Sequence, residues 1–269
     1  MITPPIPMQL KIVQTSQDPR FTQLRPGVSV QDLGLREASQ GLFSARRVRA
    51  AGEWSLAALA GESSPWFSVL YLVEGWLTLE HAGTQVTLNK DDAICQASLA
   101  GNVTAASPTL DLIEILALDH PGVRALMPQR PQPLVARDSP EAHEIGAGPR
   151  DFFDYRDLGV AALTNRQLEI QVVRARRART GGTGWHSHSM AQLSYGLSGW
   201  ASLGVEGREQ PVFQRLGDAF SIPANGVHNA DSFSDDYWAL QLQIPADYAT
   251  DPKPDPRPSA RHHQGPQDA

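Results

Sequence analysis

The segments GGTGWHSHSMAQLSYGLSG (residues 181–199) and GDAFSIPANGVHNADS (residues 217–232) contain three histidines and a glutamine at the spacing of β-strands. Successive side chains of a strand alternate between its two faces, so His186 and His188 share one face. Gln192 has the same parity as His188, and His228 follows a turn-like PANG sequence at the start of an expected neighbouring strand. Imidazole nitrogens and an amide oxygen are suitable ligands for a first-row transition metal. The sequence therefore predicts a metal site of His186, His188, Gln192 and His228 inside a β-barrel.

These two segments resemble the two sequence motifs of the cupins. The matching positions are His186, His188, Gly199, Gly217, Pro223 and His228, together with Gly181, which lies one place closer to the histidines than in the motif. Three positions depart: Gln192 replaces glutamate, Asn225 replaces glycine and Ser232 replaces asparagine. Asn225 is compatible with the turn, because asparagine adopts left-handed backbone conformations more readily than other non-glycine residues. The resemblance covers most of residues 152–250. It implies one divalent transition metal, with Fe(II) favoured and Zn, Ni or Mn as alternatives.

The first half of the chain repeats the pattern of the second half. The matched pairs are Gly75-Trp76 with Gly199-Trp200, Asp92-Ala93 with Asp218-Ala219, and Val48-Arg49-Ala50 with Val173-Arg174-Ala175, at offsets of 124 to 126 residues. Short apolar and β-branched runs between glycines and turn residues predict strands throughout. We therefore predict an all-β protein of two tandem cupin double-stranded β-helix (jelly-roll) barrels, a bicupin.

The repeat also predicts how the chain is divided. We expect a degenerate N-terminal barrel at residues 1–127, a proline-rich linker at 128–150, a metal-binding C-terminal barrel at 151–250 and a disordered tail at 251–269, which is rich in proline and charge. At the repeat positions of the four ligands, the first half has Glu62, Ser64, Ser68 and Asn102. The N-terminal barrel is therefore predicted to hold no metal.

Composition and charge limit the partners of the chain. Hydrophobic residues make up 41% and charged residues 19% of the 269 residues, which is typical of a chain that buries substantial cores. The net charge of −6 does not favour nucleic acid, and no apolar run is long enough to span a bilayer. The single cysteine, Cys95, lies in an apolar run, which predicts a buried, inert thiol. One cysteine and the lack of a signal peptide favour a cytoplasmic protein. The cupin resemblance implies a small-molecule substrate. The resemblance also leaves room for a homodimer.

The strands around the ligands predict the walls of the site. On the strand at 238–244, apolar residues alternate with polar ones and give one apolar face, so we expect apolar walls. Phe220 and Ile222 share a parity on the strand before His228. Ser194 and Gly196 follow Gln192 on its own face, where their small size either leaves room for a ligand or relieves crowding in the core. By parity, Trp185 and Tyr195 should point away from the metal.

A neutral ligand set leaves the metal its full charge, which strengthens it as a Lewis acid. The resemblance implies three functions: an Fe(II)-type dioxygenase of an aromatic or dicarbonyl compound, which we favour; a non-redox isomerase, cyclase, lyase or uronate-type hydrolase with Zn, Ni or Mn; and a small-molecule-binding protein without catalysis. No catalytic residue is assigned. Asp218 is near the ligands in sequence and is the one candidate base, although this position commonly serves the turn.

Overall fold

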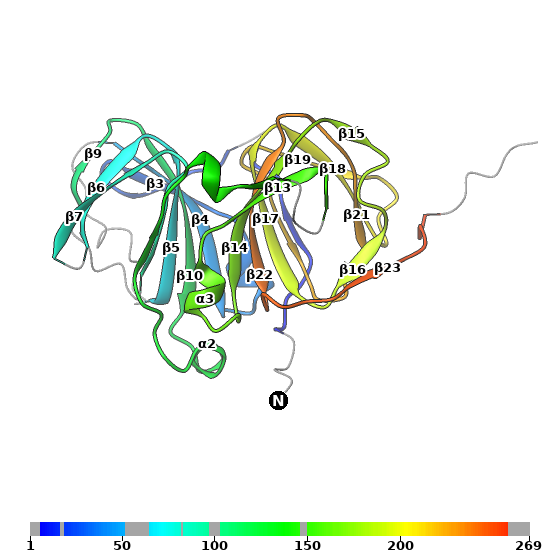
Figure 1. Ribbon diagram of the computed structural model, residues 1–269, viewed down its shortest axis with the longest axis horizontal. Helices are drawn as coiled ribbons and strands as arrows, with labels where there is room; N and C mark the ends of the chain where they lie inside the picture. The colour runs from blue at the N-terminus through cyan, green and yellow to red at the C-terminus, as the bar shows by residue number, and fades with distance from the viewer. Residues whose placement is uncertain are drawn as a thin grey trace, which may run out of the picture.

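The computed structural model describes residues 6–16, 19–51, 65–81, 83–96, 103–145 and 150–257. These residues form two β-barrels side by side, with the first half of the chain at the left of Figure 1 and the second half at the right. The predicted all-β class and the tandem barrels are confirmed. No helix in these ranges is both long and apolar enough to cross a membrane.

The N-terminal barrel contains two sheets. Its strands are β2 (Thr22–Arg25), β3 (Val28–Asp32), β4 (Phe43–Ala50), β5 (Pro65–Glu74), β6 (Trp76–His81), β7 (Thr84–Asn89), β8 (Ala93–Gln96), β9 (Val103–Ala106), β10 (Leu110–Leu118) and β11 (Leu134–Ala136). The large sheet has the order β11-β8-β5-β10-β4-β3-β2 and the small sheet the order β7-β6-β9. The helices α1 (Leu35–Ala38) and α2 (Pro121–Leu126) and the 3₁₀ turn η2 (Pro140–Ala142) lie in its connections.

The C-terminal barrel repeats this arrangement. Its strands are β1 (Lys11–Val13), β12 (Glu144–Ile145), β13 (Phe153–Asp157), β14 (Glu169–Ala175), β15 (Arg179–Thr180), β16 (His186–His188), β17 (Ala191–Ser198), β18 (Trp200–Val205), β19 (Val212–Arg215), β20 (Ala219–Ile222), β21 (His228–Phe233), β22 (Trp238–Ile244) and β23 (Thr250–Pro252), and α3 (Val160–Leu163) precedes β14. The large sheet has the order β1-β20-β17-β22-β14-β13-β12. The second sheet, β19-β18-β21-β16-β23 with β15 on β21, carries the histidine segment.

The barrels exchange edge strands at their boundary. β1, from the start of the chain, pairs with β20 of the C-terminal barrel, and β11, from the predicted linker, pairs with β8 of the N-terminal barrel. β12, also from the predicted linker, pairs with β13. The segment 128–150 therefore contributes a strand to each barrel, and the first strand of the chain belongs to the second barrel. These three strands have two or three residues each, too few to show an alternating pattern in the sequence.

Residues at the start of the predicted tail are also ordered. β23 pairs with β16, and the backbone N–H of Lys253 donates to the carbonyl of Trp185 at 2.8 Å. The disorder predicted for 251–269 is therefore wrong for its first residues, 251–257, because they complete the second sheet. Residues 258–269 lie outside the described part of the chain.

The large sheets of the two barrels pack against one another. One buried cluster joins apolar side chains of both, among them Tyr71 and Ile113 from the first barrel and Tyr195 and Leu240 from the second. Arg156, only 1% exposed, extends from β13 to the first barrel and donates from Nη1 to the carbonyl of Asp91 at 2.7 Å. The barrels are therefore held together by a continuous core and by buried polar contacts.

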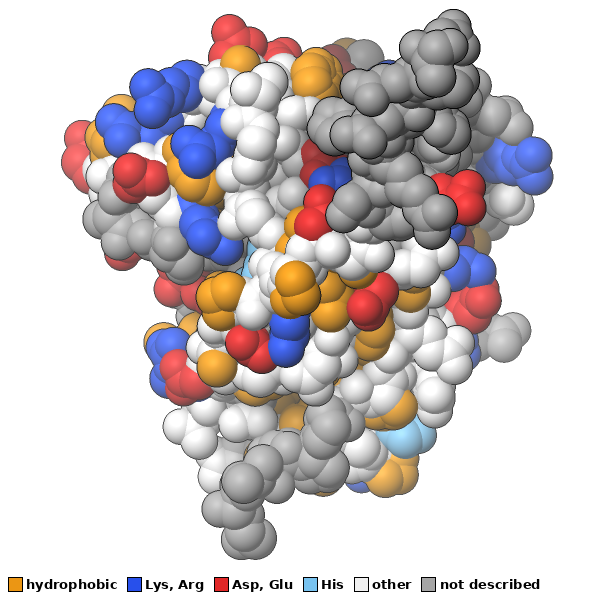
Figure 2. Space-filling view, turned by 90° about the vertical axis from the view of Figure 1, so that its right-hand side faces the viewer, with side chains coloured by type: hydrophobic (Ala, Val, Ile, Leu, Met, Phe, Trp, Pro, Cys, Tyr) orange, Lys and Arg blue, Asp and Glu red, His pale blue; other side chains and the backbone are white. Residues whose placement is uncertain are grey.

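Two further features bear on function. Cys95 is fully buried on β8, and burial raises the pKa of its thiol to about 12, in agreement with the predicted inert thiol. In Figure 2, which faces the right-hand side of the molecule in Figure 1, acidic and basic side chains lie interspersed on the surface, with hydrophobic side chains between them.

Candidate metal centre

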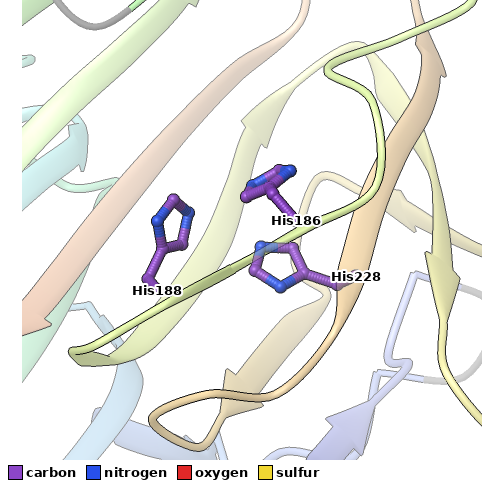
Figure 3. Close-up of side chains that lie close together, drawn as sticks. All are labelled: His186, His188 and His228. Atoms are coloured by element: carbon purple, nitrogen blue, oxygen red, sulfur yellow. The ribbon is translucent and has the colours of Figure 1, made fainter. Parts of the chain in front are cut away.

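The three histidines converge inside the C-terminal barrel. His186 and His228 are register partners on the paired strands β16 and β21, and His188 lies two residues further along β16 on the same face. The ring centroids are separated by 4.6 Å (His186–His188), 4.5 Å (His186–His228) and 5.3 Å (His188–His228). One ring nitrogen of each lies within 4.8 Å of the others, and the rings turn toward a common point (Figure 3). The triad can therefore bind a metal ion.

Each ring is held by a hydrogen bond at Nδ1. The partners are the carbonyl of Gly184 for His186 at 2.6 Å and the carbonyl of Gly226 for His228 at 2.9 Å. A carbonyl only accepts, so in both rings Nδ1 carries the proton and Nε2 presents its lone pair. The Nδ1 of His188 lies 2.9 Å from the Oγ1 of Thr250, on β23. Such contacts fix the ring orientation and the tautomer that a metal requires.

Burial keeps the three imidazoles neutral. It lowers the pKa of His188 to about 3, with the neighbouring His186 and His228 adding to the effect, and the pKa of His228 to about 4. It also lowers the pKa of His186. A metal binds the unprotonated ring, so at neutral pH no proton has to be displaced. The chemistry of this donor set therefore fits a divalent transition metal.

Gln192 contacts the triad from β17. Its Nε2 lies 3.2 Å from the Nε2 of His228, and the side chain is buried. The structure thus brings all four residues of the predicted site together. The turn before His228 also forms as expected, since Asn225 has a left-handed φ of 63° and its N–H donates to the carbonyl of His188 at 2.7 Å.

A cavity of about 520 Å³ opens above the histidines. Its polar lining includes Gln171, Gln241 and Gln243, the phenols of Tyr155 and Tyr248, and the cations Arg150 and Lys253, and no aspartate or glutamate is found among its described lining residues. Phe220 and Ile222 line it as predicted. Apolar and aromatic side chains such as Phe153, Trp185 and Met190 also line it, so the cavity suits a small molecule with both apolar and polar groups, and its cations favour an anion.

The predicted apolar wall on β22 is wrong. Gln241 and Gln243 line the cavity, whereas Leu240 and Leu242 lie in the core between the barrels. Alternation separates the two faces of a strand, but it does not say which one faces the lumen. The apolar face of β22 packs against the first barrel, and its face with the two glutamines therefore lines the cavity.

The small residues and the aromatic neighbours of the ligands have mixed outcomes. Ser194 lines the cavity, but Gly196 does not: a Cβ there would lie 2.2 Å from the carbonyl oxygen of Arg215, so Gly196 is needed for a close backbone approach. Tyr195 points away, into the core between the barrels, as predicted. Trp185 lines the cavity, contrary to the parity prediction, because β16 begins only at His186.

Asp218 serves the turn and is not part of the cavity lining. Its buried carboxylate accepts from the backbone N–H groups of Thr15 at 2.8 Å, Ser16 at 2.9 Å and Arg215 at 2.9 Å. It thereby fastens the segment after β1 to the second barrel and is not available as a base.

Several residues of the site were missed in the sequence. Arg150 lies at the end of the predicted linker, Thr250 at the end of the predicted barrel and Lys253 in the predicted tail. None has a motif, and only the pairing of β16 with β23 brings Thr250 and Lys253 to the histidines. Of the positions compared in the first barrel, Glu62, Ser64 and Asn102 lie outside the described residues, and Ser68 is buried on β5.

Comparison with known proteins supports the fold. No protein-family model and no curated protein sequence matches the chain. Solved structures do match. Protein Ylba from E. coli has a TM-score of 0.63 and 13% identity over 92% of this chain and 95% of its own. Procruciferin, an 11S globulin from Brassica napus, has a TM-score of 0.60 and 10% identity over 90% and 86%. Oxalate decarboxylase from Lactobacillus farciminis has a TM-score of 0.56 and 12% identity over 87% and 86%.

These three proteins share only 10–13% of their residues with this chain, and one fold can host different functions. The likeness therefore concerns the fold and not the reaction. Each match extends over most of both chains and thus includes both barrels. Together with the strand order, it shows that the chain has a bicupin fold, and the histidine triad of its C-terminal barrel could hold a metal ion.

Proposed function

We propose that the C-terminal barrel is a metal-dependent enzyme that acts on a small, polar organic molecule. The observation that carries this proposal is the triad itself: three neutral imidazoles, each held at Nδ1, facing one another at a cavity of about 520 Å³. A structural cluster of histidines would have no need of an adjoining cavity with a polar lining.

His186, His188 and His228 would hold the metal through Nε2, and Gln192 would be a fourth ligand through its amide oxygen. The carboxamide now directs Nε2 toward His228, and rotation by half a turn about its last bond brings Oε1 to the same place. All four ligands are neutral, so a bound divalent ion would retain its full charge and polarise an anionic, oxygen-bearing ligand.

The favoured reaction is an Fe(II)-dependent dioxygenation of a dicarbonyl compound. The described lining of the cavity has no carboxylate that could act as a general base, which a redox reaction at the metal does not need. The amides of the lining can donate to a dicarbonyl compound, and the aromatic side chains Phe153, Trp185 and Phe220 can pack against the aromatic alternative. The test is oxygen uptake with 1,3-dicarbonyl compounds by protein loaded with Fe(II). We expect uptake that requires iron and is lost in His186→Ala, whereas iron-loaded protein inert to O₂ with all such compounds would refute this reaction.

A second candidate is a non-redox reaction on Zn, Ni or Mn, and Tyr248 favours it. Its ring lies 5.1 Å from that of His188, and burial raises the pKa of its phenol, which therefore remains a proton donor at neutral pH. Elemental analysis of protein purified without added metal separates the two candidates, since native Zn or Ni would support this one. Tyr248→Phe should then reduce turnover, and tight ligand binding without any turnover would leave only a binding protein.

A further inference from the structure

One cation in the cavity has no partner. Arg150 is half-buried at the entrance to β13 and lines the cavity. Its guanidinium makes no ion pair or side-chain hydrogen bond with any residue that the structure describes. The other cation of the lining, Lys253, is paired with Asp251 at 2.5 Å. A partly desolvated charge without a counter-charge is unfavourable, so a ligand that supplies a negative charge would be stabilised there.

A buried amide is only partly satisfied, because the side chain of Gln243 has a hydrogen bond with Tyr248 but leaves its oxygen unpaired. Gln243 is 2% exposed, lines the cavity, and has no hydrogen-bond partner at Oε1 among the described residues. It is the register partner of Gln192 on the neighbouring strand, so it lies beside the metal centre. Buried polar atoms are nearly always hydrogen-bonded, and an unpaired one inside a cavity indicates a ligand that donates to it.

Two phenols complete this group. Tyr155 and Tyr248 both line the cavity, and the charge of Arg150 acts on both of them as well as on His186 and His188. Arg150 is therefore close to the two phenols and to the triad. A phenol is protonated at neutral pH, so both hydroxyls can donate to an anion.

We propose that Arg150, Tyr155 and Tyr248 form a carboxylate-binding subsite and that Gln243 accepts a hydrogen bond from the same ligand. The substrate is then a small, oxygen-rich carboxylate: its carboxylate lies against the guanidinium and the phenols, and its other oxygens face the histidines. This inference deepens the proposed function and rests on it, because it places the substrate of that reaction in the same cavity. A planar guanidinium is well suited to a carboxylate, which it can bind through two parallel hydrogen bonds.

The test uses two compounds that differ only in the proposed group: 2,4-dioxopentanoate has a carboxylate where pentane-2,4-dione has a methyl group. Their affinities for the full chain are measured by calorimetry, with and without metal. We expect 2,4-dioxopentanoate to bind at least about tenfold more tightly in both states, because a charge-assisted hydrogen bond contributes that much. In Arg150→Gln the preference should fall to within about threefold, and Arg150→Lys should retain part of it.

Arg177→Gln is the matched control, because it removes the same charge from an exposed position outside the cavity lining and should leave the preference intact. Unchanged affinity of Arg150→Gln for pentane-2,4-dione shows that the cavity is preserved. Equal affinity of the wild type for the two compounds, failure of both to bind, or an unaltered preference in Arg150→Gln would overturn the subsite. If the metal-free protein prefers 2,4-dioxopentanoate but no metal-loaded form turns over a substrate, the carboxylate subsite is supported and the proposed enzymatic function is refuted. If a metal-loaded form shows turnover but the protein has no preference for the carboxylate, the enzymatic function is supported and the subsite is refuted.

Discussion

The two barrels share a strand order but differ inside. In the N-terminal barrel, β5 and β10 place Leu70 and Leu116 in a buried leucine-rich cluster. At the same register positions, β17 and β22 of the C-terminal barrel have Ser194 and Gln243, which line the cavity. Smaller and polar side chains at equivalent positions of the C-terminal barrel thus line a cavity where the N-terminal barrel packs leucines, although the large sheets have the same strand order.

A second pair of equivalent positions shows the same difference. On the paired strands β4 and β10, Arg46 and the fully buried Glu114 form an ion pair. The equivalent register pair on β14 and β22 is Gln171 and Gln241, whose amides lie 3.3 Å apart at the cavity. Arg46 and the Oε2 of Glu114 pair with each other, although the Oε1 of Glu114 has no partner among the described residues, whereas the neutral amides retain donors and acceptors that face the cavity. The first barrel is therefore expected to support the structure and the second to hold the proposed metal centre, and the variants below test this division.

The largest effect is expected at the metal. His228→Ala removes one of three imidazoles whose positions are fixed, and we expect bound metal to fall from one ion per chain to none, an affinity loss of at least about 100-fold. Elemental analysis after dialysis against limiting metal measures it. Ser68→Ala is the matched control in the first barrel, because Ser68 occupies on β5 the place that Gln192 occupies on β17. Equal metal content in His228→Ala and wild type would contradict the assignment of the metal centre to the C-terminal barrel.

Truncation of an interior side chain should reduce the free energy of unfolding more in the N-terminal barrel than in the C-terminal barrel. Leu70 is fully buried, and Leu70→Ala should reduce the free energy of unfolding by about 2–5 kcal/mol, as is usual when a large core side chain is removed. Ser194→Ala should cost less than about 1 kcal/mol, because Gln214 keeps its bonds to the Ser194 carbonyl and to the hydroxyl of Tyr237. Urea unfolding measures both, and equal losses would contradict the contrast between a filled and a hollow barrel.

The exchanged edge strands give a third contrast. Asp218 fastens the segment after β1 and Asp92 the segment after β11, where it accepts from the N–H of Asp138 and from Arg137, both at 2.8 Å. Asp218→Ala leaves three backbone donors without their acceptor, one of them the buried N–H of Thr15, and we expect a loss of about 3 kcal/mol in unfolding free energy. Asp92→Ala should cost less, because the freed Arg137 side chain is half-exposed and can turn to water. Urea unfolding measures both variants. A smaller loss of unfolding free energy in Asp218→Ala than in Asp92→Ala would contradict this prediction.

The sequence was sufficient for the parts of the site that depend on local geometry. The alternation of side chains on one strand placed His186 and His188 together, and the motif resemblance placed His228 across from them. Parity could not say which face of β22 meets the lumen, because that is decided by the first barrel packing against Leu240 and Leu242. The strand exchange was hidden for a related reason: segments as short as β1 and β11 acquire their structure from the edges that they join.

A fourth contrast separates the barrels by the pH dependence of stability. The folded-state pKa values of His188, about 3, and His228, about 4, lie below the ordinary value for histidine. Between pH 6.5 and about 4 the unfolded chain therefore binds protons that the folded, metal-free chain does not, so stability falls as the pH falls. Each histidine should contribute a slope of about 1.4 kcal/mol per pH unit within that window.

His188→Asn should remove its share of this slope. The matched variant in the first barrel is His120→Asn, because His120 is exposed and caps α2 through Nδ1, a role that asparagine can also fill. Urea unfolding of metal-free protein at a series of pH values measures the slope in both variants, and the larger change is expected in His188→Asn. Because carboxylates also titrate in this range, the informative quantity is the difference between each variant and the wild type. The same slope in all three proteins would mean that the triad is not held neutral by burial, and the physical basis for metal binding at that barrel would be lost.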